Sequence, residues 1–229
     1  MMPKIHIIYN ETYDQNIHEL VEKRHTKLAY AGGRLFASRL KKAIKPMLSK
    51  VLLTMEETTG LSWRWEHMRC YVAHDIPYDF DDPFTIKIRK NMRDAVETFF
   101  HELGHQLELQ NKQRIIWRNP IADKYSREPQ DTREHILSHA ILWKTYEKVY
   151  GKARLKRIIN GYKLWPEHYR GWKIVEQEGA DNILKAYIKS APALHKLKHR
   201  IERRIEKRKI SQLENKTKPV KLFKGRRRR

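Results

Sequence analysis

The segment AVETFFHELGHQLELQN, residues 95–111, carries two histidines four positions apart, His101 and His105, and Glu102 directly follows the first. A helix advances about 100° per residue, so side chains four apart lie on one face and both imidazoles can bind one cation. In this HExxH arrangement the glutamate is a base rather than a ligand, and it takes a proton from the water that attacks a carbonyl carbon. The spacing predicts a Zn²⁺ site with His101 and His105 as ligands and Glu102 as the catalytic base.

A catalytic zinc site needs a third protein ligand and one position left open for water. The next helical segment, residues 131–150, offers Glu134, His135 and His139. In helical projection His135 and His139 share a face, whereas Glu134 points away from His139 by about 140°. The residues themselves leave the third ligand open among these three.

The motif FFHELGHQ resembles the active-site helix of the zincin metallopeptidases, in which a small twisted sheet packs on two helices and an edge strand holds the substrate. This resemblance covers residues 84–107. The segment SHAILWKTYEKVYG is similar to the SprT-like zincins, where a histidine precedes a bulky aromatic by four residues, here His139 and Trp143. That similarity implies His139 as the third ligand, and a gluzincin pattern would imply Glu134 instead.

Two features depart from the SprT-like pattern. Ala140 follows His139 where that group has glycine, and the gap between His105 and His139 is longer than in that group. Cys70 is the only cysteine, so the chain has no zinc ribbon made of cysteines and no intramolecular disulfide. A single cysteine is typical of a reducing compartment.

The elements around the motif follow from the hydrophobic pattern. Phe84, Ile86 and Ile88 alternate with polar residues, which predicts an edge or half-exposed strand that would hold a peptide substrate. The HExxH helix is predicted over residues 93–110, with its apolar stripe opposite the two histidines. Further predictions are strands at 4–9 and 67–76, helices at 10–31, 34–57, 131–150, 152–161 and 171–189, and a loop at 112–130.

The segment EHYRGW, residues 167–172, lies beyond these ligands. His168, Tyr169 or Arg170 in this segment could donate a hydrogen bond to a developing oxyanion, and the alternative is that all three are ordinary surface residues. Pro166 is predicted to separate the helix at 152–161 from the helix at 171–189.

The positive charge gathers at the C-terminal end. The chain of 229 residues has a net charge of +22, and Lys196 to Arg229 hold 16 Lys and Arg against 3 acidic residues. Leu194, Leu197, Ile201 and Ile205 recur at helical intervals, which predicts a basic amphipathic helix followed by a disordered tail. Such a segment would bind nucleic acid by counterion release. The alternatives are a solvated tail, a localisation signal or attachment to an anionic membrane surface.

The fold class expected from these elements is α+β, with a mostly helical zincin-like domain at residues 1–193 and a basic helix and tail at 194–229. The first 25 residues show neither a signal peptide nor a membrane helix, which favours a cytoplasmic protein. The expected function is zinc-dependent hydrolysis of peptide bonds, on protein or peptide substrates associated with nucleic acid. The alternative is a non-enzymatic nucleic-acid-binding protein with a structural metal site.

Overall fold

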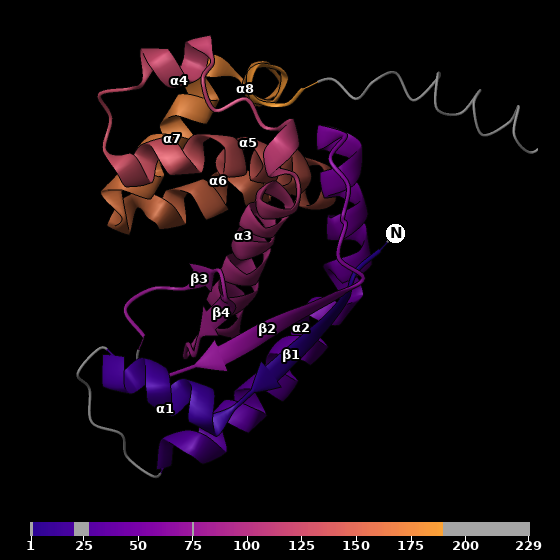
Figure 1. Cartoon of the computed structure of the whole chain (residues 1–229), viewed down its shortest axis with the longest axis vertical. Helices are drawn as coiled ribbons and strands as arrows, with labels where there is room; N and C mark the ends of the chain where they lie inside the picture. The colour runs from indigo at the N-terminus through magenta and orange to yellow at the C-terminus, as the bar shows by residue number, and fades with distance from the viewer. Residues whose placement is uncertain (1, 21–27, 75, 190–229) are drawn as a thin grey trace, which may run out of the picture. The chain divides into compact units, whose positions relative to one another are not determined.

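The computed structural model describes residues 2–20, 28–74 and 76–189, and the predicted basic helix and tail lie outside these residues. The described chain is mostly helical with a small mixed sheet, which confirms the α+β class (Figure 1). The strands are β1 (Lys4–Tyr9), β2 (His67–Ala73), β3 (Phe80–Asp81) and β4 (Phe84–Lys87). The helices are α1 (Glu11–Leu20), α2 (Leu28–Thr59), α3 (Met92–Gln110), η1 (Lys112–Arg114), α4 (Pro120–Lys124), α5 (Gln130–Tyr150), α6 (Lys152–Gly161), η2 (Tyr162–Leu164), α7 (Pro166–Glu178) and α8 (Ala180–Tyr187).

The sheet has the strand order β1-β2-β4-β3, with β1, β2 and β4 parallel and β3 antiparallel to β4. The prediction that residues 84–88 form an edge strand was wrong, because β4 lies between β2 and β3 and its residues Phe84, Thr85 and Ile86 are buried. The chain reverses at residues 82–83, and this reversal lets Phe80–Asp81 pair with the outer side of β4. The edge strand on this side of the sheet is therefore β3, which contacts α3.

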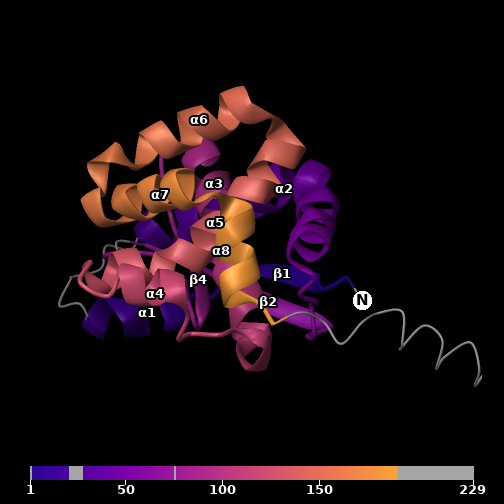
Figure 2. The ribbon, with the colours of Figure 1, turned by 90° about the horizontal axis from the view of Figure 1, so that it is seen from above.

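Helix α3 lies between the sheet and the C-terminal helices (Figures 1 and 2). It begins after Asn91, whose side chain accepts a hydrogen bond from the Arg93 N–H, a typical N-cap. The predicted apolar stripe is buried, with Phe99, Leu103 and Leu107 fully inaccessible to solvent. Burial of this stripe sets the orientation of α3 in the fold. It therefore also sets the direction in which the opposite face, predicted to carry His101 and His105, points. Among the residues described, no helix is at once long enough and apolar enough to cross a bilayer.

The C-terminal helices differ from the prediction in two places. The segment 171–189 is not one helix, because Gly179 has φ = 81° and separates α7 from α8. Pro166 separates α6 from α7 as predicted, but it also begins α7, at residue 166 instead of 171, since proline lacks only an N–H that the first helical turn leaves unpaired. The predicted loop at 112–130 contains η1 and α4. The early start of α7 places His168 on the first turn of a helix.

One polar group inside the fold gives a testable dependence of stability on pH. The buried Asp14 carboxylate accepts hydrogen bonds from the His74 backbone N–H (2.7 Å) and the Tyr9 hydroxyl (2.9 Å), and it lies 2.8 Å from His74 Nδ1. Burial by itself raises the pKa of Asp14, but the bonds from His74 and Tyr9 outweigh it and lower the pKa below its ordinary 3.8. The stabilisation is therefore present above pH 3.8 and is lost as the pH falls through the lower folded-state pKa.

We expect Asp14→Asn to lower the free energy of unfolding at neutral pH by about 1–3 kcal/mol, because the charged acceptor is lost. The difference from wild type should shrink as the pH falls through the lowered pKa of Asp14, because the wild-type carboxylate then becomes protonated as well. Urea unfolding of wild type and variant, at neutral pH and again at acid pH, measures the difference in the free energy of unfolding at each pH. Asp123→Asn is the control, because its carboxylate is exposed. A difference that stays constant with pH would contradict the prediction.

Candidate metal centre

The two histidines of HExxH approach each other on α3. His101 Nε2 and His105 Nε2 lie 3.2 Å apart. Two nitrogens bound to one tetrahedral zinc at about 2.0–2.1 Å would be roughly 3.3 Å apart. The separation of the two ring nitrogens is therefore the one that a shared zinc ion requires.

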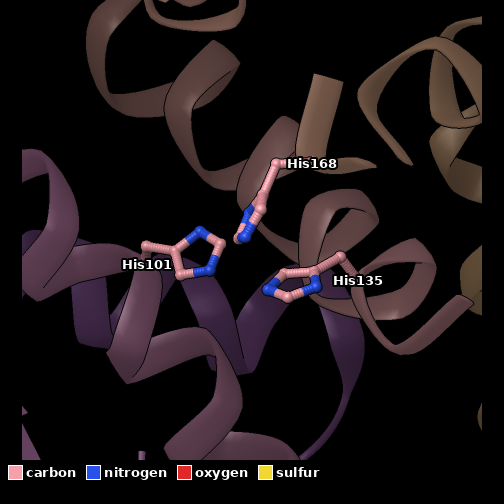
Figure 3. A group of neighbouring side chains, drawn as sticks. All are labelled: His101, His135 and His168. Carbon is pink, nitrogen blue, oxygen red and sulfur yellow. The ribbon is translucent and has the colours of Figure 1, made fainter. Parts of the chain in front are cut away.

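Two further imidazoles come from other helices. His135 lies near the start of α5 and His168 near the start of α7, and their ring centroids are 3.9 Å apart. One ring nitrogen from each of His101, His135 and His168 lies within 4.8 Å of the others, and Figure 3 shows the three rings turned toward one another. The His105 ring adjoins this group, with its centroid 4.9 Å from that of His135. Three helices thus bring four imidazoles around one small volume, which we call the histidine cluster.

In His101 and His135 one ring nitrogen, which we call the outer nitrogen, has a hydrogen-bonding partner. This contact holds each ring in a fixed orientation. Tyr162 Oη lies 3.2 Å from His101 Nδ1, and His135 Nδ1 lies 2.6 Å from the Asp131 carbonyl oxygen. Histidines that bind metals commonly use the second nitrogen in this way, which leaves the lone pair of the first for the ion. His168 Nδ1 is buried without a hydrogen-bond partner among the described residues. Such an atom costs free energy unless a cation or a donor satisfies it.

The electrostatics of the cluster favour neutral imidazoles. Burial, followed by the neighbouring histidines, holds the pKa of His101 well below its ordinary 6.5. For the same reasons the pKa of His105 falls to about 3 and that of His168 to about 4. The neutral ring is the form that offers a lone pair to a metal ion. The donor set of the cluster therefore fits zinc, which favours imidazole nitrogen in tetrahedral sites.

Glu102 directly follows His101 on α3 and is buried, at 7% exposure. Burial raises the pKa of its carboxyl group well above the ordinary 4.5, Asp79 and Asp81 raise it further, and Arg89 acts in the opposite direction. Within the described residues, no side chain or backbone group forms a hydrogen bond with this carboxyl group, so it is free to accept and hold a proton. A cation in the cluster would favour its charged form.

His139, the third ligand that the SprT-like resemblance implied, is not among the histidines whose nitrogens converge. Its ring is fully buried, lies flat on the Trp172 indole with centroids 4.2 Å apart, and has no hydrogen-bond partner at either nitrogen among the described residues. It sits one turn beyond His135 on α5, where α7 presents Trp172. Glu134 is exposed and accepts a hydrogen bond from Gln130. Of the three alternatives for the third ligand, the structure brings His135 to His101 and His105.

Close packing of α7 on α5 explains how His168 reaches the cluster. A Cβ added to Gly171 would lie 2.9 Å from His139 Nδ1, so only glycine allows this approach of the two helices. Thr132 Oγ1 on α5 donates to the Glu167 carbonyl oxygen at 3.1 Å, which joins the first turns of the two helices. These contacts place His168 over the start of α5.

From the sequence, His168 was expected only as a donor to an oxyanion or as a surface residue. Pro166 was the signal that would have placed it, because a proline at the first helical position puts His168 and Trp172 one turn apart on one face. Arg170, considered with it, pairs with Glu128 at 2.6 Å and lies outside the cluster.

The histidine cluster does not line the hollow that opens over the sheet. A hollow of about 600 Å³ opens over the sheet and is lined by residues that include His6, Trp65, Asp82 and Gln106, but by none of the four cluster histidines. His101 is only 3% exposed and His135 only 9%. His101 and His135 are thus interior residues, whereas His105 and His168 are partly exposed.

Comparison of the chain with protein families, curated proteins and solved structures finds no match.

Proposed function

We propose that the chain is a zinc-dependent metallopeptidase of the zincin type, in which His101, His105 and His135 hold Zn²⁺ and Glu102 is the general base. The observation that carries this proposal is the 3.2 Å separation of His101 Nε2 and His105 Nε2, with the His135 ring against both. Zinc, when bound, would supply Lewis acidity, which polarises a carbonyl group and lowers the pKa of water.

The chain's own residues supply the proton transfer and the positioning. Glu102 takes the proton of the attacking water on its carboxylate and later donates it to the leaving amine. Its burial and its lack of a competing hydrogen bond among the described residues suit this role. Tyr162 and Asp131 hold the outer nitrogens of His101 and His135 and keep the rings in a fixed orientation.

The edge strand β3 is the proposed site of the substrate backbone, in place of Phe84–Ile88. It has no partner on its outer side among the described strands, so an extended peptide can add to it by backbone hydrogen bonds. Gln106, next to His105 on α3, donates through its side chain to the Asp81 carbonyl oxygen and joins β3 to the HExxH helix. The small sheet, with β3 at its edge, and the long helices α2 and α3 support the zincin assignment, because that fold has a small sheet packed on two helices and an edge strand for the substrate.

The first test is metal binding together with cleavage. We expect purified protein loaded with zinc to retain about one equivalent after dialysis, and His101→Ala to lose it. An unfolded protein substrate should be cleaved by the wild type, and a chelator should stop cleavage until zinc is restored. Zinc is measured by atomic absorption, and His67→Ala is the control because His67 is an exposed histidine of β2. Retention of zinc by His101→Ala would contradict the assignment.

The basic C-terminal segment would bring the peptidase to proteins bound on nucleic acid, in line with the charge of Lys196 to Arg229. Replacing Arg226, Arg227, Arg228 and Arg229 by glutamine should weaken duplex DNA binding at low salt. The slope of log K against log salt should become shallower by up to roughly 0.9 for each phosphate that the variant no longer neutralises. Fluorescence anisotropy at several salt concentrations measures this slope. An unchanged slope would show that these arginines do not bind phosphate.

A non-enzymatic nucleic-acid-binding protein with a structural metal site is the second candidate. One observation favours it: beside the three histidines whose nitrogens lie within 4.8 Å of one another, His101, His135 and His168, a fourth imidazole, that of His105, lies 3.2 Å from His101. Structural zinc sites have four protein ligands, whereas catalytic sites have three and an open position. Hydrolysis of a protein substrate that is lost in Glu102→Gln decides between the two candidates.

A further inference from the structure

We propose that His168 is a fourth protein ligand of the zinc site, and that the structure is the closed, resting form of the peptidase. The inference rests on the proposed zinc site. It adds to that site a residue from a different helix and a mode of regulation.

The His168 ring lies where a zinc ligand would have to lie. Its ring nitrogen lies within 4.8 Å of nitrogens of both His101 and His135, and its ring centroid is 3.9 Å from that of His135. Its Nδ1 is buried and has no hydrogen-bond partner among the described residues, while Nε2 lies 3.5 Å from Asp131 Oδ2. The same Asp131 also holds the outer nitrogen of His135. His168 therefore has the arrangement of a ligand, with one nitrogen toward a carboxylate and the other facing inward without a partner.

The number of ligands that zinc accepts limits what else can bind in this site. Zinc in a closed site takes four ligands in tetrahedral geometry. His101, His135 and His168 bring ring nitrogens within 4.8 Å of one another, and His105 Nε2, which lies 3.2 Å from His101 Nε2, would supply the fourth ligand. With all four bound, no position remains for water or for a substrate carbonyl. Catalysis then requires one imidazole to withdraw.

His168 is the ligand that the fold can release at least cost. Its side chain is 25% exposed, whereas the His101 residue is only 3% exposed and sits in the middle of α3. It lies on the first turn of α7, directly after the exposed residues Leu164 (81%) and Trp165 (55%). Helix ends next to exposed connections open locally at lower free energy than the middle of a packed helix. Withdrawal of this turn would leave a site with three histidines and one open position.

Cobalt substitution tests the inference without relying on turnover. The full-length protein is loaded with Co²⁺, and its visible spectrum is recorded while azide is added. We expect no response in wild type, because no position is open, and a saturable spectral change in His168→Ala. His168→Gln, which keeps the length of the side chain, covers the case in which the alanine variant fails to fold. His67→Ala is the matched control, since His67 is exposed on β2 and outside the cluster.

Zinc affinity and cleavage give two further readouts. Competition with a chelator should show that His168→Ala binds zinc on the order of 10- to 100-fold more weakly than wild type. If the open form is about 1–10% of the wild-type population, removing His168 should raise cleavage of an unfolded protein by about 10- to 100-fold.

The outcomes separate this inference from the proposed function. Equal azide responses in wild type and His168→Ala would overturn it, and so would a variant that remains unresponsive while it binds cobalt. An open site in His168→Ala that never cleaves any protein would support the fourth ligand and contradict the peptidase. Failure of wild type to bind zinc or cobalt at all would overturn the proposed metal site and, with it, this inference.

Discussion

Replacement of Glu102 by glutamine is expected to lower the rate of peptide hydrolysis by about 10²- to 10⁴-fold, the usual contribution of a general base. The amide cannot accept the proton of the attacking water, although it has nearly the same shape as the carboxyl group. Zinc binding should remain at the wild-type level, because Glu102 is proposed as a base and not as a ligand. The rate is measured on an unfolded protein substrate, in the wild-type chain and again in the His168→Ala background where the site is open.

Glu134→Gln is the matched control for this experiment. Glu134 is an exposed glutamate on α5 and is the residue that a gluzincin pattern would make a ligand. We expect this variant to hydrolyse substrate and bind zinc as wild type does. Loss of zinc in Glu134→Gln would reverse the assignment of the third ligand, and unchanged hydrolysis in Glu102→Gln would remove the proposed base.

The second large effect concerns the third ligand. Removing His135 should weaken zinc binding by at least 100-fold, which corresponds to about 2.7 kcal/mol. At a zinc concentration about 100 times the wild-type Kd, bound metal stabilises the wild-type fold by about 2.7 kcal/mol, and His135→Phe should lose most of this stabilisation. Thermal unfolding with and without zinc measures the loss, and chelator competition measures the affinity directly.

His139→Phe is the matched variant, because it removes both ring nitrogens and keeps an aromatic ring against Trp172. We expect it to bind zinc with wild-type affinity. Its stability without metal should be unchanged or higher, since the two buried nitrogens have no hydrogen-bond partner among the described residues and their loss removes an unfavourable group. Weak zinc binding in His139→Phe together with normal binding in His135→Phe would restore the ligand that the sequence predicted.

The two experiments address different parts of the centre. Glu102→Gln tests proton transfer at a group that does not bind the ion, whereas the pair on α5 tests the coordination of the ion itself. Zinc binding without hydrolysis in every variant, including His168→Ala, would favour the structural metal site of a nucleic-acid-binding protein. A hydrolytic His168→Ala that depends on Glu102 would favour the peptidase.

Periodicity in the sequence was sufficient to identify the helix that carries His101, Glu102 and His105. The apolar stripe that includes Phe99 and Leu103 fixes which side of α3 is buried, and a spacing of four residues then places both imidazoles on one face. The same local information predicted α5, which follows with further histidines. Both results depend only on interactions within a helix, and these are determined by neighbours in the sequence.

The choice of the remaining ligands was decided by tertiary packing. His135 and His139 share one face of α5, so periodicity does not separate them. The separation arises because α7, brought close by Gly171, places Trp172 against His139 and His168 beside His135. The order of the strands was decided in the same way, since the burial of β4 depends on its pairing with β2 and β3. Packing between segments distant in the sequence fixes both features, and a pattern of local spacings does not contain that information.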